Sequence, residues 1–509
     1  MSKRIWFLFF KAMLTMGVVL GLVSNHAWAA STFAYGADIG WLKQLEDEGV
    51  SWVNDNGVQQ DSLSILKDHG INSVRLRVFV NPDASAYWYK DSTTWTMLGY
   101  ADKASVIAAA QRAQNLGMRI MVDFHYSDVF ADPGHQIKPA AWQNYSVSQL
   151  TTAVYNHTYD VMNSLKNAGI TPEWAQVGNE MDPGILLPTG STSNFANLAQ
   201  FLNAGYDAVK AVSSSTKVIS HLAHGTDNSA SRWFFNNFLN VYGGKTDVIG
   251  FSFYPYWDGE SYWNLTDDLA YNLNDMAATY GKEVMVTEVG GLETNPTDSY
   301  WTVKDTIDLV KAVPNSKGIG VFYWEPEANS SVLSDGYPLG ATTLVSNKVL
   351  QFSHALDAFS DGQIKIDSSK TYRIINRNSG KALNVVGGST SDGANIEQYT
   401  YGGWASQQWQ LTALGNGFYR ITNVNSGKLM DIYGASTTDG AQNIQWSSNG
   451  GWNQQWLILD IGNGYYKIKN RNSGKLLDIT GKSTADGALD IQYRDNGGLN
   501  QQWQILENQ

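Results

Sequence analysis

Two glutamates each end an apolar segment. Solubility explains a carboxylate poorly at such a position, whereas acid–base chemistry explains it well. Glu180 ends the run Gln176-Val-Gly-Asn-Glu180, and Glu288 ends the run Val284-Met-Val-Thr-Glu288, so each follows an apolar segment typical of a buried strand. Hydrolysis of a glycosidic bond needs such a pair: one acid protonates the leaving oxygen, and one carboxylate attacks the anomeric carbon. The alternative for either glutamate alone is a strand-end residue that forms a structural ion pair with an arginine.

Neighbouring polar side chains could assist this pair. Asn179 precedes Glu180 and can hold the 2-hydroxyl of a sugar. Arg77 is expected to keep Glu288 ionised, because a nearby positive charge lowers the pKa of a carboxyl group. Tyr254 can donate a hydrogen bond to the same carboxylate. These neighbours favour the catalytic interpretation over the structural ion pair.

Histidines provide further candidates. His125 and His221 also end apolar segments, and we expect them to bind sugar hydroxyls. A metal site is the competing interpretation of His125, Asp128, Asp132 and His135, but their spacing matches no zinc motif. The sequence therefore predicts no metal ion and no other cofactor.

The elements that would position these residues alternate along residues 31–362. Eight short apolar runs, expected to be strands, are separated for the most part by longer segments of helical spacing. The runs are residues 33–38, 73–80, 119–125, 174–179, 217–221, 248–254, 283–287 and 318–324, and the helical segments include 61–69, 103–116, 150–168 and 195–212. This alternation predicts an α/β domain, a (β/α)8 TIM barrel with its chemistry at the carboxyl ends of the strands. A doubly wound sheet is disfavoured because no glycine-rich phosphate loop follows the first strand.

After about residue 362 the helical spacing ends and a repeat begins. The sequence Gln-Gln-Trp occurs at 407–409, 454–456 and 501–503, so the copies are 47 residues apart, and Asn-Ser-Gly-Lys and Asp-Gly-Ala precede each copy. One such unit is too small to bury a core, so the three units must pack around a common axis. We therefore expect a second, all-β domain at 370–509.

Composition excludes several classes of protein. The 509 residues carry a net charge of −12, which disfavours a nucleic-acid partner because phosphate binding needs a basic face. The absence of cysteine excludes disulfides and thiolate chemistry. The 19 Trp and 26 Tyr suit stacking on neutral, hydroxyl-rich ligands such as sugars, although a tryptophan-rich core is the alternative.

Residues 1–29 are typical of a secretory signal peptide. Lys3-Arg4 gives a basic start, an apolar stretch follows, and Ala27-Trp-Ala29 forms a small-residue cleavage site. The alternative is a membrane anchor, but Lys11 leaves about 12 apolar residues, short of the ~20 that span a bilayer. We therefore expect a secreted, extracellular protein with a bacterial-type signal peptide, no membrane span after cleavage, and a monomeric state.

Nine motifs distributed over residues 33–330 resemble glycoside hydrolase family 53, the arabinogalactan endo-β-1,4-galactanases. They are Gly36-Ala-Asp-Ile39, Ile65-Leu-Lys-Asp-His-Gly-Ile71, Arg75-Leu-Arg77, Asp123-Phe-His-Tyr-Ser-Asp128, Ala131-Asp-Pro-Gly134, Lys138-Pro-Ala-Ala-Trp142, Gln176-Val-Gly-Asn-Glu180, Ser252-Phe-Tyr-Pro-Tyr256 and Phe322-Tyr-Trp-Glu-Pro326. The resemblance implies cleavage of β-1,4-galactosidic linkages in galactan or type I arabinogalactan with retention of configuration. Glu180 would be the acid/base and Glu288 the nucleophile.

The same resemblance implies stacking of sugars on Trp142 and Trp324. The full set of expected substrate-binding residues is Asn179, Arg77, His125, Asp128, Trp142, His221, Tyr254 and Trp324. Some bacterial relatives bind calcium in a late loop, but residues 290–302 are few and contain no obvious ligand cluster, so the metal is not carried over. Met181-Asp182-Pro183 departs from the Ile-Asn expected after the acid/base, which leaves the subsite preference open.

The Gln-Gln-Trp repeats resemble a ricin-type β-trefoil, as in carbohydrate-binding module family 13. The tryptophan of each copy is expected in the core, and the resemblance implies sugar contacts from an aspartate, an aromatic residue and an asparagine. These are Asp431, Trp446 and Asn453 in the second copy, and Asp478, Tyr493 and Asn500 in the third. The first copy has Asn384, Tyr399 and Ser406 instead, and so loses a charge-assisted hydrogen bond. The alternative is a trefoil that serves only for stability or spacing.

Together these features predict a secreted endo-β-1,4-galactanase whose lectin-like domain binds the polysaccharide. Two alternatives stay open: a related barrel acting on another β-1,4-glycan such as mannan or xylan, and a non-catalytic lectin. The presence of both Glu180 and Glu288, with Asn179 and Arg77, argues against the lectin.

Overall fold

The computed structural model describes residues 33–508 except 55–56, 84–85, 92–93, 334–335, 360–365, 415–417 and 462–463. The predicted signal peptide at 1–29 lies outside the described residues. Across the described ranges, no helix combines the length and apolarity needed to cross a membrane.

Eight parallel strands close into a barrel, in the order β1, β14, β13, β12, β11, β8, β7, β4. Their bounds are Ala34–Asp38 (β1), Ser73–Val78 (β4), Arg119–Phe124 (β7), Trp174–Val177 (β8), Lys217–Leu222 (β11), Val248–Phe253 (β12), Glu283–Val289 (β13) and Gly318–Trp324 (β14). Each strand coincides with one of the eight predicted runs, and the TIM barrel is confirmed.

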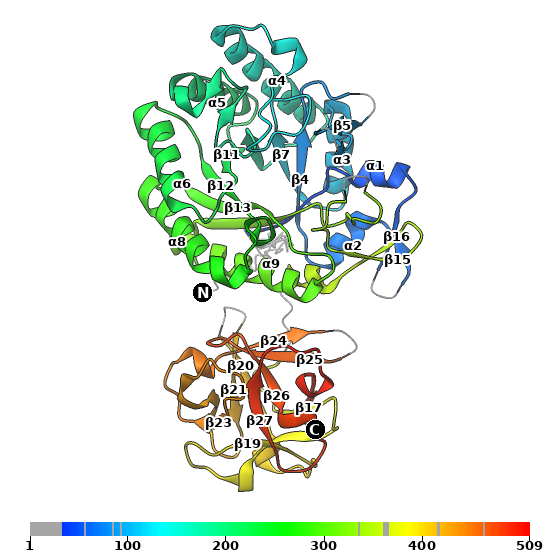
Figure 1. Cartoon of the computed structure of the whole chain (residues 1–509), viewed down its shortest axis with the longest axis vertical. Coiled ribbons are helices and arrows are strands. Elements are labelled where there is room, and N and C mark those ends of the chain that lie inside the picture. The colour runs from blue at the N-terminus through cyan, green and yellow to red at the C-terminus, as the bar shows by residue number, and fades with distance from the viewer. Residues whose placement is uncertain are drawn as a thin grey trace, which may run out of the picture. The chain divides into compact units, whose positions relative to one another are not determined.

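Helices surround these strands (Figure 1). They are α1 (Leu42–Asp47), α2 (Ser62–Asp68), α3 (Lys103–Asn115), α4 (Val147–Asn167), α5 (Phe195–Val212), α6 (Asn228–Phe235), α7 (Pro255–Asp258), α8 (Tyr262–Tyr280) and α9 (Pro296–Lys311). Helix α4 begins three residues before its predicted start, because Ser146 and Gln149 form a capping box that satisfies the free N–H groups of its first turn.

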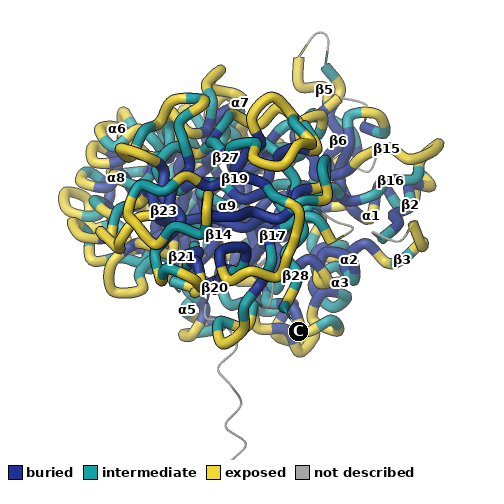
Figure 2. Tube along the Cα trace, turned by 90° about the horizontal axis from the view of Figure 1, so that it is seen from below, coloured by how far each residue is buried: buried dark blue, intermediate teal, exposed yellow. Residues whose placement is uncertain are grey.

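Short strands extend from the barrel. β15 (Thr342–Ser346), β16 (Val349–Phe352), β2 (Ser51–Val53) and β3 (Gln59–Gln60) form one sheet, while β5 (Tyr87–Tyr89) pairs with β6 (Trp95–Met97) and β9 (Gly184–Ile185) pairs with β10 (Gly190–Ser191). Figure 2 shows β14 deeply buried and the β5 segment far more exposed. The β5–β6 hairpin therefore carries side chains that solvent or a ligand can reach.

Strand β4 shows how the barrel positions charge. All six of its residues are buried, because parallel strands in a barrel are covered on both faces. Arg75 and Arg77 are two residues apart, and side chains at that spacing point to the same face of a strand. Both guanidinium groups are therefore enclosed by protein, where each needs carboxylate partners.

The C-terminal domain is an all-β trefoil made of three copies of four strands. They are β17 (Tyr372–Asn376), β18 (Ala382–Val385), β19 (Ile396–Tyr399), β20 (Trp409–Ala413), β21 (Phe418–Asn423), β22 (Leu429–Ile432), β23 (Asn443–Trp446), β24 (Trp456–Asp460), β25 (Tyr466–Asn470), β26 (Leu476–Ile479), β27 (Ala488–Tyr493) and β28 (Trp503–Glu507). The first and last strands of the copies pair in a closed antiparallel ring. The middle strands of each copy form a hairpin.

The repeated tryptophans occupy the core of this domain, as the sequence predicts. Trp409, Trp456 and Trp503 are each 0% exposed. A buried indole N–H needs an acceptor, and that of Trp456 donates to the carbonyl oxygen of Met430 at 3.1 Å. The other two indoles make the equivalent bond in their own copies. The repeated tryptophan therefore fills the core of the domain in each copy.

The substitution Trp456→Ala tests this role. We expect it to lower the free energy of unfolding of the trefoil by about 3–5 kcal/mol, because it leaves a large cavity and an unpaired carbonyl. Trp452→Ala is the matched control, since that side chain is 56% exposed. Denaturant unfolding of the full chain, followed by intrinsic fluorescence, measures both; equal losses for the two variants would contradict the assignment.

Candidate active site

A hollow of about 520 Å³ opens at the carboxyl ends of the barrel strands. Glu180, which follows β8, and Glu288, in β13, both line it. The wall is strongly aromatic and includes Trp41, Trp88, Phe130, Tyr254, Tyr256, Trp257, Trp324 and Tyr337. Concave sites lined by aromatic side chains with a few convergent polar groups are typical of ligand-binding sites.

The two glutamates lie close together. A carboxylate oxygen of Glu180, a carboxylate oxygen of Glu288 and a ring nitrogen of His221 are all within 4.8 Å of one another. The backbone of Glu180 has a φ of 44°, in the left-handed region that costs a non-glycine residue of order 1–3 kcal/mol. Such strain persists where the surrounding structure demands a particular side-chain direction, here toward Glu288.

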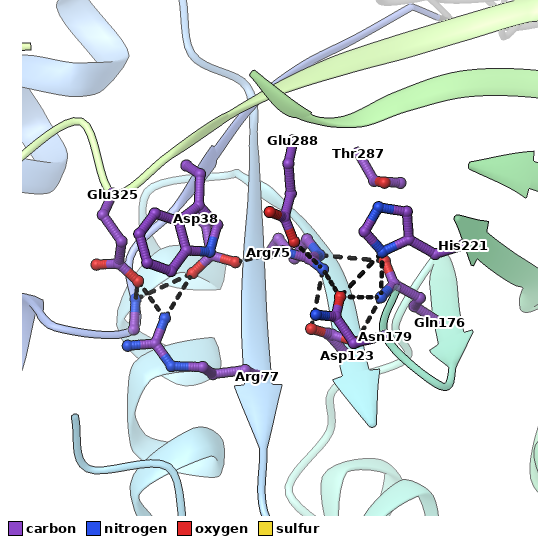
Figure 3. A network of polar contacts seen from close by, with 12 residues as sticks. Asp38, Arg75, Arg77, Asp123, Gln176, Asn179, His221, Thr287, Glu288 and Glu325 are labelled. Atoms are coloured by element: carbon purple, nitrogen blue, oxygen red, sulfur yellow. Dashed lines mark hydrogen bonds and ion pairs between the residues drawn. The ribbon is translucent and has the colours of Figure 1, made fainter. Parts of the chain in front are cut away.

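Arg75 is at the centre of the polar network that supports this pair (Figure 3). Its Nη1 donates to Asp38 at 2.7 Å, and its Nη2 lies 2.9 Å from both Asp123 and Glu288. The same Nη2 donates to Asn179 Oδ1 at 2.8 Å. One buried cation therefore holds the nucleophile candidate and the asparagine beside the acid/base candidate.

The two carboxyl groups sit in different electrostatic environments. Burial raises the pKa of Glu288, but Arg75 and the Tyr254 hydroxyl, which donates to Oε2 at 3.0 Å, oppose that rise. Burial and the charge of Glu288 raise the pKa of Glu180 well above its ordinary value. The hydrogen bond from Ser252 opposes this rise, but no neighbouring cation does. A single proton shared by the pair therefore resides on Glu180, and Glu288 ionises first.

His221 acts on Glu180 through Ser252. The Ser252 hydroxyl donates to Glu180 Oε1 at 2.7 Å, and His221 Nε2 lies 2.9 Å from the same hydroxyl oxygen. The other ring nitrogen, Nδ1, accepts from the backbone N–H of Glu180. Burial holds the pKa of His221 well below its ordinary value, which keeps the ring neutral. His221 is 0% exposed, so the expectation that it binds sugar hydroxyls is wrong.

Arg77 does not contact Glu288, and the predicted role belongs to Arg75. Arg77 is instead paired with Asp38 and Glu325. Glu325 also accepts the backbone N–H groups of Gly40 and Trp41, each at 2.8 Å. Arg77 thus links the end of β1 to the end of β14. It lies against the aromatic wall and does not contact the nucleophile candidate.

Trp142 and Asp128 also lie elsewhere than predicted. Trp142 is buried in the hydrophobic core, where its ring packs edge-on against His157, so it offers no face for stacking. Asp128 accepts the backbone N–H groups of Asn81 and Ala140 and shapes the loop after β7. Neither placement can be read from the sequence pattern.

The remaining predicted residues do border the hollow. Asn179, His125, Tyr254 and Trp324 all line it. The ring of His125 bridges Asp123 and the backbone N–H of Ala131. Of the residues in the alternative metal site, Asp132 and His135 pair with each other, while His125 and Asp128 bind other groups.

Residues 34–359 of this chain match the family model for glycosyl hydrolase family 53. The chain belongs to glycosyl hydrolase family 53. Residues 363–446 and 452–509 match a second family model, described as a ricin-type beta-trefoil lectin domain-like family. This glycoside hydrolase therefore joins a family 53 barrel to a lectin-like trefoil.

Known relatives agree with this assignment. A probable arabinogalactan endo-beta-1,4-galactanase A of Aspergillus fumigatus is 34% identical over 323 residues, which are 59% of this chain and 86% of the relative. The arabinogalactan endo-beta-1,4-galactanase of Thermothelomyces thermophilus is 34% identical over 312 residues, 57% of this chain and 88% of the relative. A solved structure of fungal beta-1,4-galactanases aligns with a TM-score of 0.56 and 31% identity, covering 64% of this chain and 99% of that one.

In the trefoil of this hydrolase, the aspartates predicted for the second and third copies are bonded to amides of their own copies. Asp431 accepts from Asn453 at 2.9 Å and from Gln454 at 2.7 Å, and the ring of Trp446 is 38% exposed. In the third copy Asn500 and Gln501 hydrogen-bond to Asp478 and lower its pKa, against a larger rise caused by burial. Each aspartate is thus held rigidly by the amides that follow it in the repeat.

The first copy contains a carboxylate that sequence reasoning missed. Asn384 accepts from the Ser406 hydroxyl at 2.9 Å and donates to Glu397 at 2.8 Å. Glu397 lies on β19, opposite Asn384 on β18. A negative charge therefore returns to the copy that lacks the aspartate, although on the neighbouring strand.

Most of the aromatic wall of the hollow was also missed. Trp41 and Trp324 contact each other at 4.9 Å between ring centroids, and Trp324 contacts Tyr337 at 4.8 Å. Their positions in the sequence could have indicated them. Trp41 follows the end of β1 by three residues, and Tyr256 and Trp257 follow Tyr254 after β12. Aromatic residues just beyond strand ends are candidates for the barrel mouth.

The substitution Ser252→Ala tests the electrostatic role of the hydroxyl. Its hydrogen bond favours the charged form of Glu180, so its removal should raise that pKa further. We expect the basic limb of the kcat/KM profile to move to higher pH by about one unit, since one hydrogen bond to a charged group is worth about that much. The acid limb, which Glu288 governs, should stay in place; a shift of both limbs would contradict the assignment.

Proposed function

We propose that this family 53 hydrolase is a secreted, endo-acting β-1,4-galactanase that retains anomeric configuration. The observation that carries the mechanism is the pair Glu180 and Glu288, with carboxylate oxygens within 4.8 Å and with unequal electrostatic environments. Retaining enzymes hold their carboxyl groups about 5–5.5 Å apart, whereas inverting enzymes need about 6.5–9.5 Å to admit a water. The names of the relatives support galactan as the substrate.

In the first step Glu180 donates its proton to the glycosidic oxygen. Glu288 attacks the anomeric carbon, and the bond to the leaving sugar breaks as an ester to Glu288 forms. Arg75 and Tyr254 keep Glu288 anionic until it attacks. Asn179, which Arg75 orients, would bind the sugar 2-hydroxyl, a contact that strengthens in the transition state.

In the second step Glu180, now a carboxylate, accepts a proton from water. The resulting hydroxide attacks the anomeric carbon, and Glu288 leaves with its electron pair. Glu288 loses its negative charge when it forms the ester, and this loss lowers the pKa of Glu180 at the moment when Glu180 must act as a base. The Ser252 hydroxyl supports that charged form.

The substitutions Glu288→Gln and Glu180→Gln test the two roles. Each should reduce hydrolysis of galactan by about a thousandfold or more, because each removes a reacting group. They should differ with an activated aryl galactobioside, which needs no protonation of its leaving group: Glu180→Gln should form the ester there and be rescued in part by azide. Reducing-sugar release and aryl release measure this difference.

The same assay separates galactanase activity from its alternatives. The wild type should act on galactan and type I arabinogalactan and much less on mannan or xylan. Proton NMR of the first product should show the β-anomer. A first-formed α-anomer, or equal losses by Glu180→Gln on all leaving groups, would contradict the mechanism.

For the trefoil we propose weak binding of galactose-containing polysaccharide. Asp431 and Asp478 are charged acceptors already oriented by neighbouring amides, and charge-assisted hydrogen bonds are stronger than neutral ones. Several weak sites on one domain can bind the same polymer at once, which raises the apparent affinity.

The proposal that the protein is secreted rests on the signal-peptide pattern of residues 1–29.

Affinity electrophoresis in a gel containing galactan tests this binding. Asp431→Ala and Asp478→Ala should each reduce retardation of the full chain, and the double variant should run nearly as in a plain gel, since each loses a bond of about 1.5–3 kcal/mol. Hydrolysis of short soluble oligosaccharides should be unchanged because the barrel holds the chemistry. Full retardation of the double variant would show that these aspartates do not bind the polymer.

A further inference from the structure

Two motifs of the trefoil repeat, Asn-Ser-Gly-Lys and Asp-Gly-Ala, take no part in the sugar contacts proposed for this domain. The lysine of the first motif pairs with the aspartate of the second across copies, where the copies are β17–β20, β21–β24 and β25–β28. The pairs are Lys428 with Asp392 at 2.7 Å, Lys475 with Asp439 at 2.8 Å and Lys381 with Asp486 at 2.6 Å. Each aspartate thus belongs to one copy and its lysine to the next, and the third copy pairs with the first.

The aspartate of the first copy also binds the second copy beside its exposed aromatic residue, Trp446. Asp392 accepts the backbone N–H of Ser447 at 2.7 Å and its hydroxyl at 3.0 Å. Gln445, on the other side of Trp446, accepts the backbone N–H of Gly393 at 2.9 Å. A Cβ on Gly393 would lie 3.4 Å from the Trp446 ring, so the ring packs against this loop. A loop of the first copy therefore supports Trp446 from both chain neighbours and from behind.

The third copy is supported by the second in the same way. Asp439 accepts the backbone N–H of Arg494 at 2.9 Å and the guanidinium Nε of the same residue at 2.6 Å. Arg494 directly follows Tyr493, the aromatic residue of this copy. Gln492, which precedes Tyr493, accepts the backbone N–H of Gly440 at 2.8 Å. The arrangement therefore recurs 47 residues further along the chain.

These contacts fix a ring that is exposed to solvent. A side chain that becomes ordered only on binding lowers the affinity, so a ring held in place beforehand binds a sugar more tightly. We propose that each sugar site of the trefoil is shared between two copies. Asp392 is a positioning residue for Trp446 in the second-copy site, and Asp439 is a positioning residue for Tyr493 in the third-copy site. This inference rests on the proposed binding of polysaccharide by the trefoil.

A shared site gives the first copy a function. This copy has Asn384 where the other two have the aspartate expected to bind sugar, yet it keeps Asp392 in its Asp-Gly-Ala motif. Its loop is therefore needed for binding by the second copy, whatever the first copy binds itself.

Stability alone is a poor explanation of these pairs. The side chains of Lys428 and Asp392 are 18% and 37% exposed, and ion pairs near the surface add little to the free energy of unfolding. The three buried tryptophans fill the core of the domain without them. Removal of Asp392 should therefore leave the trefoil folded and loosen only the segment that carries Trp446.

Variants of the full chain that keep one charged site test the inference by affinity electrophoresis in galactan. Asp478→Ala leaves the second-copy site, and Asp431→Ala leaves the third-copy site. In the Asp478→Ala background, Asp392→Ala should raise the apparent Kd about three- to tenfold, and Asp439→Ala should change it less than about twofold. In the Asp431→Ala background the two effects should be exchanged. Each variant is thus the folding control for the other.

A conservative variant and a measurement without glycan separate positioning from binding. Asp392→Asn keeps an oxygen that can accept the Ser447 N–H, so it should recover most of the affinity that Asp392→Ala loses. Hydrogen exchange of the full chain, measured with no glycan present, should become about tenfold faster at residues 445–447 in Asp392→Ala and stay unchanged at 492–494. Asp439→Ala should show the reverse.

The outcomes are distinguishable. Equal losses in both backgrounds, an unchanged Kd at the matching site, or unchanged exchange at 445–447 in Asp392→Ala would overturn the shared site. Absence of retardation of the wild type would instead overturn the proposed binding of galactan, and the exchange experiment would then decide the positioning role by itself.

Discussion

The barrel mouth depends on one buried cation, the guanidinium of Arg75. Its two terminal nitrogens contact Asp38, Asp123 and Glu288 at 2.7–2.9 Å. A planar guanidinium is suited to several fixed carboxylate partners, which the point charge of a lysine is not. Desolvating these groups is costly, and removal of one partner of a buried ion pair costs about 3–5 kcal/mol. The network therefore stabilises one geometry, and the candidate nucleophile is part of it.

Unequal access to that cation separates the two glutamates. Glu288 contacts Arg75 directly, whereas the hydrogen bond to the Glu180 carboxylate among the described residues comes from the neutral Ser252 hydroxyl. Burial alone would raise both pKa values, so the difference between them comes from where the one cation lies. An acid and a nucleophile of the same residue type can thus stand within 4.8 Å and keep different protonation states.

The trefoil meets a different constraint, because it has three small units and no cysteine to link them. The three buried tryptophans fill the common core, and the buried carboxylate of Asp431 is held by amides of its own copy. The copies also diverge at one buried polar position. Asp431 in one copy is Asn384 in another, where Glu397 supplies the charge.

The sequence by itself determined the architecture. Eight apolar runs became eight strands, because parallel barrel strands are buried on both faces and show continuous apolar patterns. The three-fold repeat determined the trefoil, since three units of equal length must share one core. Glu180 and Glu288 were singled out because a carboxylate at the end of a buried strand has few structural explanations. Asp431 and Asp478 followed from their fixed places in the repeat.

Only the tertiary structure decided which partner each side chain meets. Arg75 and Arg77 point to the same face of β4, so the strand period could not tell which of them reaches Glu288. Their depth along the barrel decides it, and that depth depends on the register of β4 against its neighbours. The place of Trp142 was likewise beyond the pattern, because loops carry no period and their course is set by contacts between residues far apart in the chain.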